Sequence, residues 1–501
     1  MIKMLEDAST HNAAVDFQVG ACASNKARKL SILPLVALIF YEVSGGPFGI
    51  EDTVKAGGPL LAITGFALFP FIWSIPEALV TAELVTAFPE NGGYVLWISA
   101  AFGPFWGFQV GFWKWLSGVM DNALYPLLFL DYLKFSVPLL DSGAPRVAAL
   151  LVVTSCLTFL NYRGITIVGY MAISLGLFSL LPFVVLGLLA IPRIEPKRWL
   201  VSDLKRTDWR GYLNSLFWNL NFWDKASTLA GEVDKPRETF PKALLAAVIL
   251  VVFSYLIPLL AGTGALPLKQ SNWEDGYLAE VAMVIGGSWM RWWVQAAAAL
   301  SNMGLFEAEM SSDSFQLLGM SERGMLPELF AHRSRYGTPT YSILCSAIGV
   351  VALSWMRFQQ VVEFLNFLYC CGMLLEFAGF IWFTINNPGL PRPFKIPCNT
   401  VCTILMCIPP SAFLILVMCL ASKITIFVST VALIIGLLLY PGLQQIKKNG
   451  WLIFSDRGTT SLPYSDFEQE LSSSIGSEEK EQSFISMSLL TDYDGNLNHH
   501  N

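Results

Sequence analysis

The chain has 501 residues, of which 54% are hydrophobic and only 14% are charged. A soluble chain of this length needs about 25% charged residues to cover its surface, so the composition excludes an ordinary soluble enzyme, a fibrous protein and a disordered chain. The net charge of −6 also provides no basic field for nucleic acid. The remaining class is an all-α polytopic membrane protein.

Windows of about 20 mostly apolar residues predict about twelve transmembrane helices. They lie near 31–50, 60–87, 104–134, 146–161, 167–191, 212–231, 241–266, 284–321, 340–356, 360–384, 400–421 and 424–446. The eighth window is the least regular, because its second half (EAEMSSDSFQLLGMSERG) is polar. The windows form one twelve-helix membrane domain over 31–446.

Polar tails flank this domain. Residues 1–30 are expected to be a cytosolic tail and not a secretory signal, because the basic residues that end it lead into the first span. Residues 447–501 are rich in Ser, Asp and Glu and are predicted to be a disordered, acidic cytosolic tail. An even number of spans puts both tails on one side, and a small excess of Lys and Arg favours the inside.

The first span is predicted to break in its middle. It reads LPLVALIFYEVSGGPFGIED, in which Gly45, Gly46 and Gly49 permit unusual dihedral angles and Pro47 removes a backbone donor. Backbone groups at membrane depth must be paired. The amides and carbonyls that such a break exposes are therefore expected to bind other groups.

The sixth span is predicted to be the second broken helix. It reads YLNSLFWNLNFWDKASTLAGEV and is interrupted by Asn219, Asn221, Asp224 and Lys225. Polar groups at this depth usually face a cavity. Breaks at the first and sixth positions indicate a 5+5 inverted repeat with its site at the midplane. The repeats are predicted over about 31–191 and 212–384, with extra helices over 400–446.

Several motifs resemble one superfamily. GGPFGIED, IPEALVTAELVTAFPENGGYVLWISAAFGPFWGFQVGF, STLAGEVDKPRETFPKAL and LLGMSERGMLPELF resemble the first break, the second span with its loop, and the loops after spans six and eight of the amino acid–polyamine–organocation superfamily. Three segments resemble the plant polyamine:proton symporters more specifically. They read FYEVSGGPFGIED, WNLNFWDKASTLAGEVD and GLFEAEMSSDSFQLLGMSERGMLP. This resemblance implies the LeuT-type fold and carriage of polyamines and of paraquat.

Acidic and aromatic residues near the breaks are the candidate ligands. A polyamine needs carboxylates or aromatic faces for its ammonium groups and apolar rings for its methylenes. The candidate substrate-binding residues are Glu42, Ser44, Gly45, Gly46, Asp121, Tyr125, Trp218, Asn219, Asn221, Trp223, Asp224, Glu307, Glu309 and Tyr369. The aromatic role of Trp218 is implied by the arginine-exchanging relatives that it resembles.

The spacing of some candidates in the sequence places them on the same face of a helix. Asp121 and Tyr125 are four residues apart, as are Glu309 and Asp313, so each pair shares one face, whereas Glu307 lies on another. At least one of Glu307 and Glu309 is expected to face the pathway. Lys114 is expected to pair with an intramembrane carboxylate.

Burial disfavours the charged form of a carboxylate, so a buried carboxylate can load and release a proton. The resemblance to the proton symporters implies that a proton is the coupling ion. The candidates for carrying it are Glu42, Asp224 and Glu307. A polyvalent cation also gains roughly 2.3 kcal/mol per charge per 100 mV of membrane potential, so uniport driven by the potential remains an alternative.

The leading prediction is therefore a proton-coupled importer of putrescine, spermidine and spermine. A transporter of neutral or cationic amino acids on the same fold is the alternative, and a nutrient receptor that transports little is a third. No enzyme, cofactor, metal site or obligatory protein subunit is expected. The plasma membrane is the expected location, with the Golgi or another endomembrane as the rival.

Overall fold

A computed structural model describes residues 29–133, 137–267, 269–274, 276–355 and 358–455. Within these ranges every regular element is a helix, apart from four isolated β-bridges. The first 28 residues and the acidic segment from residue 456 onward lie outside the described part of the chain.

The helices follow the predicted windows closely. They are α2 (Ile32–Val43), α3 (Glu51–Ile72), α4 (Ser74–Ala87), α5 (Tyr94–Phe102), α6 (Pro104–Leu133), α7 (Gly143–Arg163), α8 (Ile165–Ala190), α9 (Trp209–Trp218), α10 (Pro236–Ala265), α11 (Tyr277–Gly286), α12 (Ser288–Glu322), α13 (Thr340–Leu353), α14 (Phe358–Asn386), α15 (Thr400–Leu420) and α16 (Lys423–Lys448). Each of the twelve windows contains a helix. The polar second half of the eighth window is helical throughout, as part of α12.

Two boundaries differ from the prediction. The first span does not end at residue 50, because helix resumes at Glu51 and turns sharply only at Gly58, which has a φ of +80°. The sixth span does not stay helical to residue 231. Its α-helix ends at Trp218, and only the short 3₁₀ turns η4 (Lys225–Thr228) and η5 (Ala230–Glu232) follow.

By length and composition, seven helical segments in the described part of the chain can cross a membrane. One is formed by α3 and α4 together, and the others are α7, α8, α10, α14, α15 and α16. The windows that fall short belong to α2, α6, α9, α12 and α13. α2 and α9 are cut by the breaks, and α6 and α12 contain several charged residues. These four helices lie in the interior of the molecule, where their charged residues are surrounded by protein and not by lipid.

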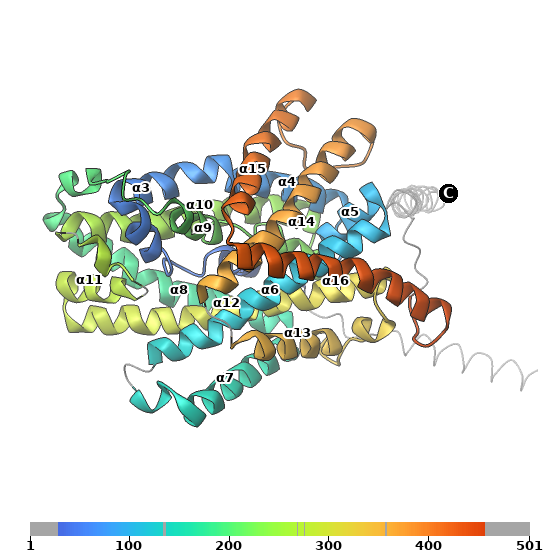
Figure 1. The fold of residues 1–501 in the computed structure, drawn as a ribbon, viewed down its shortest axis with the longest axis horizontal. Coiled ribbons are helices and arrows are strands. Elements are labelled where there is room, and N and C mark those ends of the chain that lie inside the picture. Colours follow the sequence, from blue (N-terminus) through green and yellow to red (C-terminus); the bar gives the residue numbers. More distant parts are fainter. Residues whose placement is uncertain (1–28, 134–136, 268, 275, 356–357, 456–501) are drawn as a thin grey trace, which may run out of the picture.

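The helices form one bundle around α6 and α12, which pack along each other at its centre (Figure 1). α2 packs against α8, α10 and α12, while α9 packs against α3 and α14. α15 and α16 follow the proposed repeats and lie at the periphery, against α14 and α6. Exposed apolar side chains cover α8, α15 and α16, as expected for helices that face lipid.

Candidate functional site

The first break separates α2 from α3 and is built by its glycines. Gly45, Gly46 and Gly49 have φ values of +61°, +117° and +86°, which side chains with a Cβ rarely adopt. The Ser301 hydroxyl donates to the carbonyl of Gly45, and the amide of Gly46 donates to Ser44 Oγ over 3.1 Å. The predicted break is therefore present, and neighbouring side chains satisfy part of its backbone.

The second break follows α9 and lies against the first. The Asn219 side chain donates to the carbonyl of Gly49 over 3.3 Å, which joins the two breaks directly. Phe222 has a φ of +69°, and its amide donates to the Tyr369 hydroxyl over 3.1 Å. Tyr255 donates to the carbonyl of Asn219 over 2.8 Å. Tyrosines from α14 and α10 thus hold the unwound chain.

A cavity lies between the two breaks and α6. It is lined by Glu42, Val43, Ser44, Phe48, Gly49, Asp121, Tyr125, Leu128, Trp218, Asn219, Phe222, Tyr255, Asn302 and Leu305. Six of the candidates from the sequence line it, namely Glu42, Ser44, Asp121, Tyr125, Trp218 and Asn219. Two carboxyl groups thus face a space whose other walls are largely apolar and aromatic.

Asp121 forms one wall of the cavity with its neighbours fixed around it. It accepts hydrogen bonds from the Tyr125 hydroxyl over 2.6 Å and from Trp218 Nε1 over 3.0 Å. The first bond confirms that the pair four residues apart shares one face. The second ties α6 to the end of α9, so the indole of Trp218 is held across the cavity.

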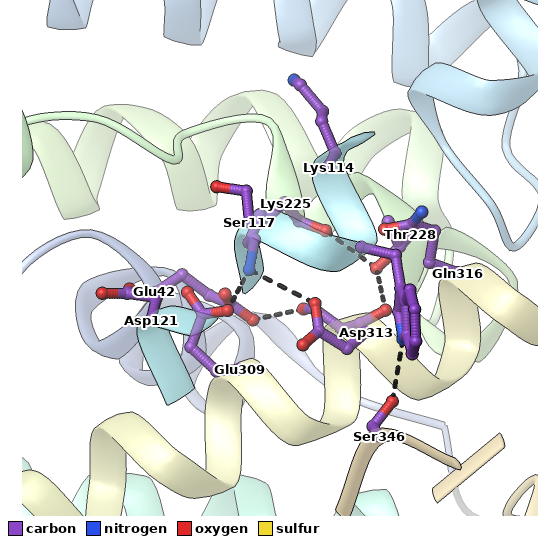
Figure 2. Close-up of polar contacts among 12 residues, drawn as sticks. Glu42, Lys114, Ser117, Asp121, Lys225, Thr228, Glu309, Asp313, Gln316 and Ser346 are labelled. Carbon is purple, nitrogen blue, oxygen red and sulfur yellow. Dashed lines mark hydrogen bonds and ion pairs between the residues drawn. The ribbon is translucent and has the colours of Figure 1, made fainter. Parts of the chain in front are cut away.

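Glu42 is the second carboxylate that lines the cavity, and it belongs to a larger group that we call the Lys225 cluster (Glu42, Lys225, Glu309 and Asp313; Figure 2). Lys225 Nζ donates to Glu309 and, over 3.3 Å, to Asp313. Ser312 donates to Glu42. Both α12 carboxylates reach the same ammonium, which confirms their predicted common face.

Lys114 organises a second buried group, the Lys114 cluster (Lys114, Asp224, Glu376 and Tyr369). Lys114 Nζ donates to Asp224 and Glu376 and lies 4.5 Å from the ring centroid of Tyr369. The Tyr369 hydroxyl is 2.5 Å from both Asp224 and Glu77. The predicted pairing of Lys114 with an intramembrane carboxylate is confirmed. Asp224 and Lys225 are adjacent in sequence but belong to different clusters.

The remaining candidates lie away from the cavity. Glu307 accepts from Asn161 of α7 over 2.7 Å, and the Trp223 indole donates to the carbonyl of Leu220 over 2.8 Å. Asn221 is fully buried beside Asn366. Glu309, Asp224 and Tyr369 are in the two clusters, and Gly45 and Gly46 contribute backbone at the break. Of the two α12 glutamates, Glu309 is the one that binds Lys225 and so belongs to the same cluster as Glu42.

Sequence reasoning missed several residues of the cavity wall. Phe48, Phe222, Tyr255, Asn302 and Leu305 line it, but each looks like an ordinary core residue in an apolar window. Their positions depend on the path of the unwound segments and on packing between distant helices. In the described part of the chain, no group of three or more His, Cys, Asp or Glu side chains is arranged to hold a metal ion.

A second, more open cavity lies on the other side of Trp218. Its lining includes Gly49 and Trp218, which it shares with the first cavity, and the charged residues Asp52, Lys55, Asp208, Arg210 and Glu363. Trp218 therefore stands between a polar vestibule and the enclosed cavity. Arg210 is paired with Glu363 at the vestibule wall.

The opposite face of the bundle is closed by polar contacts. The amide of Leu30 donates to the carbonyl of Glu232 over 2.8 Å, which ties the start of α2 to the segment after the second break. The Glu232 carboxylate also accepts from Asn91 over 2.7 Å and from Arg333 over 2.8 Å. The cavity is thus sealed toward the N-terminal face, whereas on the other side only Trp218 and Gly49 lie between it and the vestibule.

Comparisons with known proteins extend over the whole helical part. A family model described as an amino acid permease matches residues 30–449. A probable polyamine transporter of Arabidopsis thaliana is 64% identical over 452 residues, which cover 90% of this chain and 94% of the relative. Another Arabidopsis thaliana protein, named a polyamine transporter, is 61% identical over 433 residues, or 86% and 88% of the two chains. A polyamine transporter of Oryza sativa subsp. japonica is 59% identical over 452 residues, or 90% and 85%. The range matched by the family model includes both breaks, the cavity and both clusters.

Proposed function

The chain belongs to the amino acid permease family, in the branch of plant polyamine transporters within the amino acid–polyamine–organocation superfamily, and from this membership we propose that it is a polyamine transporter. It imports putrescine, spermidine and spermine by proton symport and takes paraquat as an analogue. The observation that carries the proposal is the cavity between the breaks, which presents two buried carboxyl groups inside an aromatic wall.

The cavity suits a flexible cation with two or more ammonium groups. Glu42 takes one ammonium and Asp121 takes another, because a buried positive charge must be paired to offset its desolvation. Phe48, Phe222 and Tyr255 contact the methylenes between the charges. A neutral substrate would bring neither carboxylate a compensating positive charge, so the site favours a polyvalent cation.

The state of the first break argues against an amino acid as the substrate. An amino acid carrier binds the substrate carboxylate on free amides at a half-helix terminus. Here the amides of Ser44 and Gly45 donate to the carbonyl of Phe40, over 2.9 and 3.0 Å, and the amide of Gly46 donates to Ser44 Oγ. The amide of Gly49 donates to the Glu51 carboxylate over 3.1 Å. Amides that are already bonded within the chain bind an external carboxylate poorly.

Alternating access uses the two faces of the bundle in turn. With the N-terminal face in the cytosol, the vestibule opens outward and Trp218 closes over the bound substrate. Release inward requires the contacts of Glu232 with Leu30, Asn91 and Arg333 to separate. The transporter domain covers 31–446, with repeats over 31–191 and 212–384, between two cytosolic tails. The protein acts in the plasma membrane without an obligatory partner subunit.

Binding of radiolabelled spermidine to the purified protein, with arginine and leucine as competitors, tests the proposed site. Replacing Asp121 by Asn removes one buried charge-assisted contact, which is worth about 1.5–3 kcal/mol, so the dissociation constant is expected to rise roughly 10- to 100-fold. The control is Asp203→Asn, which changes an exposed carboxylate paired with Arg206 outside the cavity. Spermidine binding that is equal in wild type and a folded Asp121→Asn variant would refute this site. Competition by leucine would favour the amino-acid alternative.

A further inference from the structure

The Lys225 cluster contains more acceptors than the described residues satisfy. Its three carboxylic side chains are each about 1% exposed or less, as is Lys225 itself. Glu42 Oε2, Glu309 Oε1 and Asp313 Oδ2 have no hydrogen-bond partner among the described residues. Glu42 also lines the cavity, so the cluster adjoins the space proposed for the substrate. The unsatisfied oxygens therefore mark a place where further positive charge can bind.

Glu42 lies beside Glu309, the carboxylate that binds Lys225 (Figure 2). Two carboxylates that share one buried site repel each other, so such a site readily holds one proton because both groups cannot ionise side by side. The hydrogen bond from Ser312 to Glu42 joins α2, beside the first break, to α12.

The charges of the cluster determine how many cations complete it. Glu42, Glu309 and Asp313 contribute three negative charges, and Lys225 contributes one positive charge. A buried group with two uncompensated charges is strongly unfavourable at membrane depth. One proton on the carboxyl pair and one substrate ammonium at Glu42 together bring the cluster to neutrality.

We propose that Glu309 holds the coupling proton, delivered through Glu42, and that the single charge of Lys225 sets the ratio at one proton per substrate. This inference rests on the proposed function. The proton enters from the vestibule and the cavity, binds Glu42, and moves to Glu309 when an ammonium approaches Glu42. Glu42 is then charged for the substrate while Glu309 is neutral, so proton and polyamine bind together.

The surroundings of Glu309 explain why it is chosen over the other acidic residues. Lys225 from η4 binds Glu309, and Glu42 from α2, Asp121 from α6 and Asp313 from α12 lie around it (Figure 2). Lys225 favours the charged form of Glu309, but the three neighbouring carboxyl groups outnumber this one cation and favour a proton on Glu309. Glu307 and Asp224, two of the candidates predicted from the sequence, do not line the cavity and are held by Asn161 and Lys114.

The test measures proton and spermidine fluxes together in proteoliposomes with the membrane potential clamped. Wild type is expected to take up one proton per spermidine. Glu309→Gln imitates the permanently protonated side chain. The number of protons taken up per spermidine is therefore expected to fall from one to zero, and spermidine uptake is expected to become independent of the proton gradient. Glu280→Gln makes the same chemical change at an exposed carboxylate of α11 paired with Arg291, and keeps the wild-type ratio.

A second variant tests the charge balance if Glu309→Gln does not fold. Lys225→Gln removes the internal cation, so neutrality then needs one more proton and the ratio is expected to rise to two. A wild-type ratio in either folded variant would overturn the assignment, as would loss of coupling in Glu307→Gln with coupling retained in Glu309→Gln. Failure of the wild type to take up spermidine at all would instead refute the proposed function.

Discussion

Single charged residues at membrane depth determine most of the architecture of the site. Lys114 and Lys225 are fully buried, and each reaches at least two carboxylates on other helices. Removing one member of such a group leaves an uncompensated charge, so each is costly to change. The sequence identified these residues because charges inside an apolar window are rare, but their partners lie about 80 to 260 residues away in the chain and came only from the fold.

The Lys225 cluster depends on a small residue beside it. Gly118 of α6 packs so closely that a Cβ there would overlap with Asp313 Oδ1 and Lys225 Nζ. Gly118→Ala therefore displaces the ion pair, and overpacking of this kind costs about 1–3 kcal/mol. We expect spermidine uptake in proteoliposomes to fall by roughly tenfold.

The matched control is Gly442→Ala in α16, where a Cβ would meet no atom within 4 Å. This variant also places Ala in a helix and is expected to transport like wild type. Normal uptake by Gly118→Ala would show that the cluster tolerates displacement and would weaken its proposed role.

At the scale of elements, the sequence predicted where helices lie better than where they stop being regular. The glycines at 45, 46 and 49 signal the first break, because positive φ values require them. The polar residues from Asn219 onward locate the second break, but they do not predict that the α-helix fails to resume before residue 231. That segment is held by side chains from other helices, including Ser74, Tyr255 and Tyr369, which no local pattern reports.

The Lys114 cluster connects α6 and α14 with the unwound segment before η4 and should support the fold more than any surface ion pair. Lys114→Met leaves Asp224 and Glu376 without their buried cation, and breaking such a pair costs about 3–5 kcal/mol. We expect a clear fall in the midpoint of thermal unfolding. Intrinsic fluorescence of the protein in detergent measures this midpoint.

Lys55→Met provides the comparison for this measurement. Lys55 pairs with Glu274 over 3.0 Å, but their side chains are 44% and 71% exposed, and exposed pairs contribute about 0–1 kcal/mol. Equal midpoints for the two variants would mean that the Lys114 cluster is not a structural support.

At the scale of the whole molecule, the two faces of the bundle differ in the way that transport requires. One face has a charged vestibule that leads to Trp218, and the other is sealed around Glu232. The sequence predicted the multi-pass helical class from composition alone and the midplane site from the paired breaks. It could not show which face is open, because that depends on contacts between loops far apart in the chain.

The central claim is that this chain carries polyamines with protons, and one flux experiment tests it most directly. Radiolabelled spermidine and putrescine uptake is measured in proteoliposomes with an inward proton gradient, a clamped membrane potential, and excess arginine and leucine. We predict uptake that the gradient stimulates and that the amino acids do not reduce. Amino-acid transport without polyamine uptake would contradict the claim and would leave the buried carboxylates with a structural role.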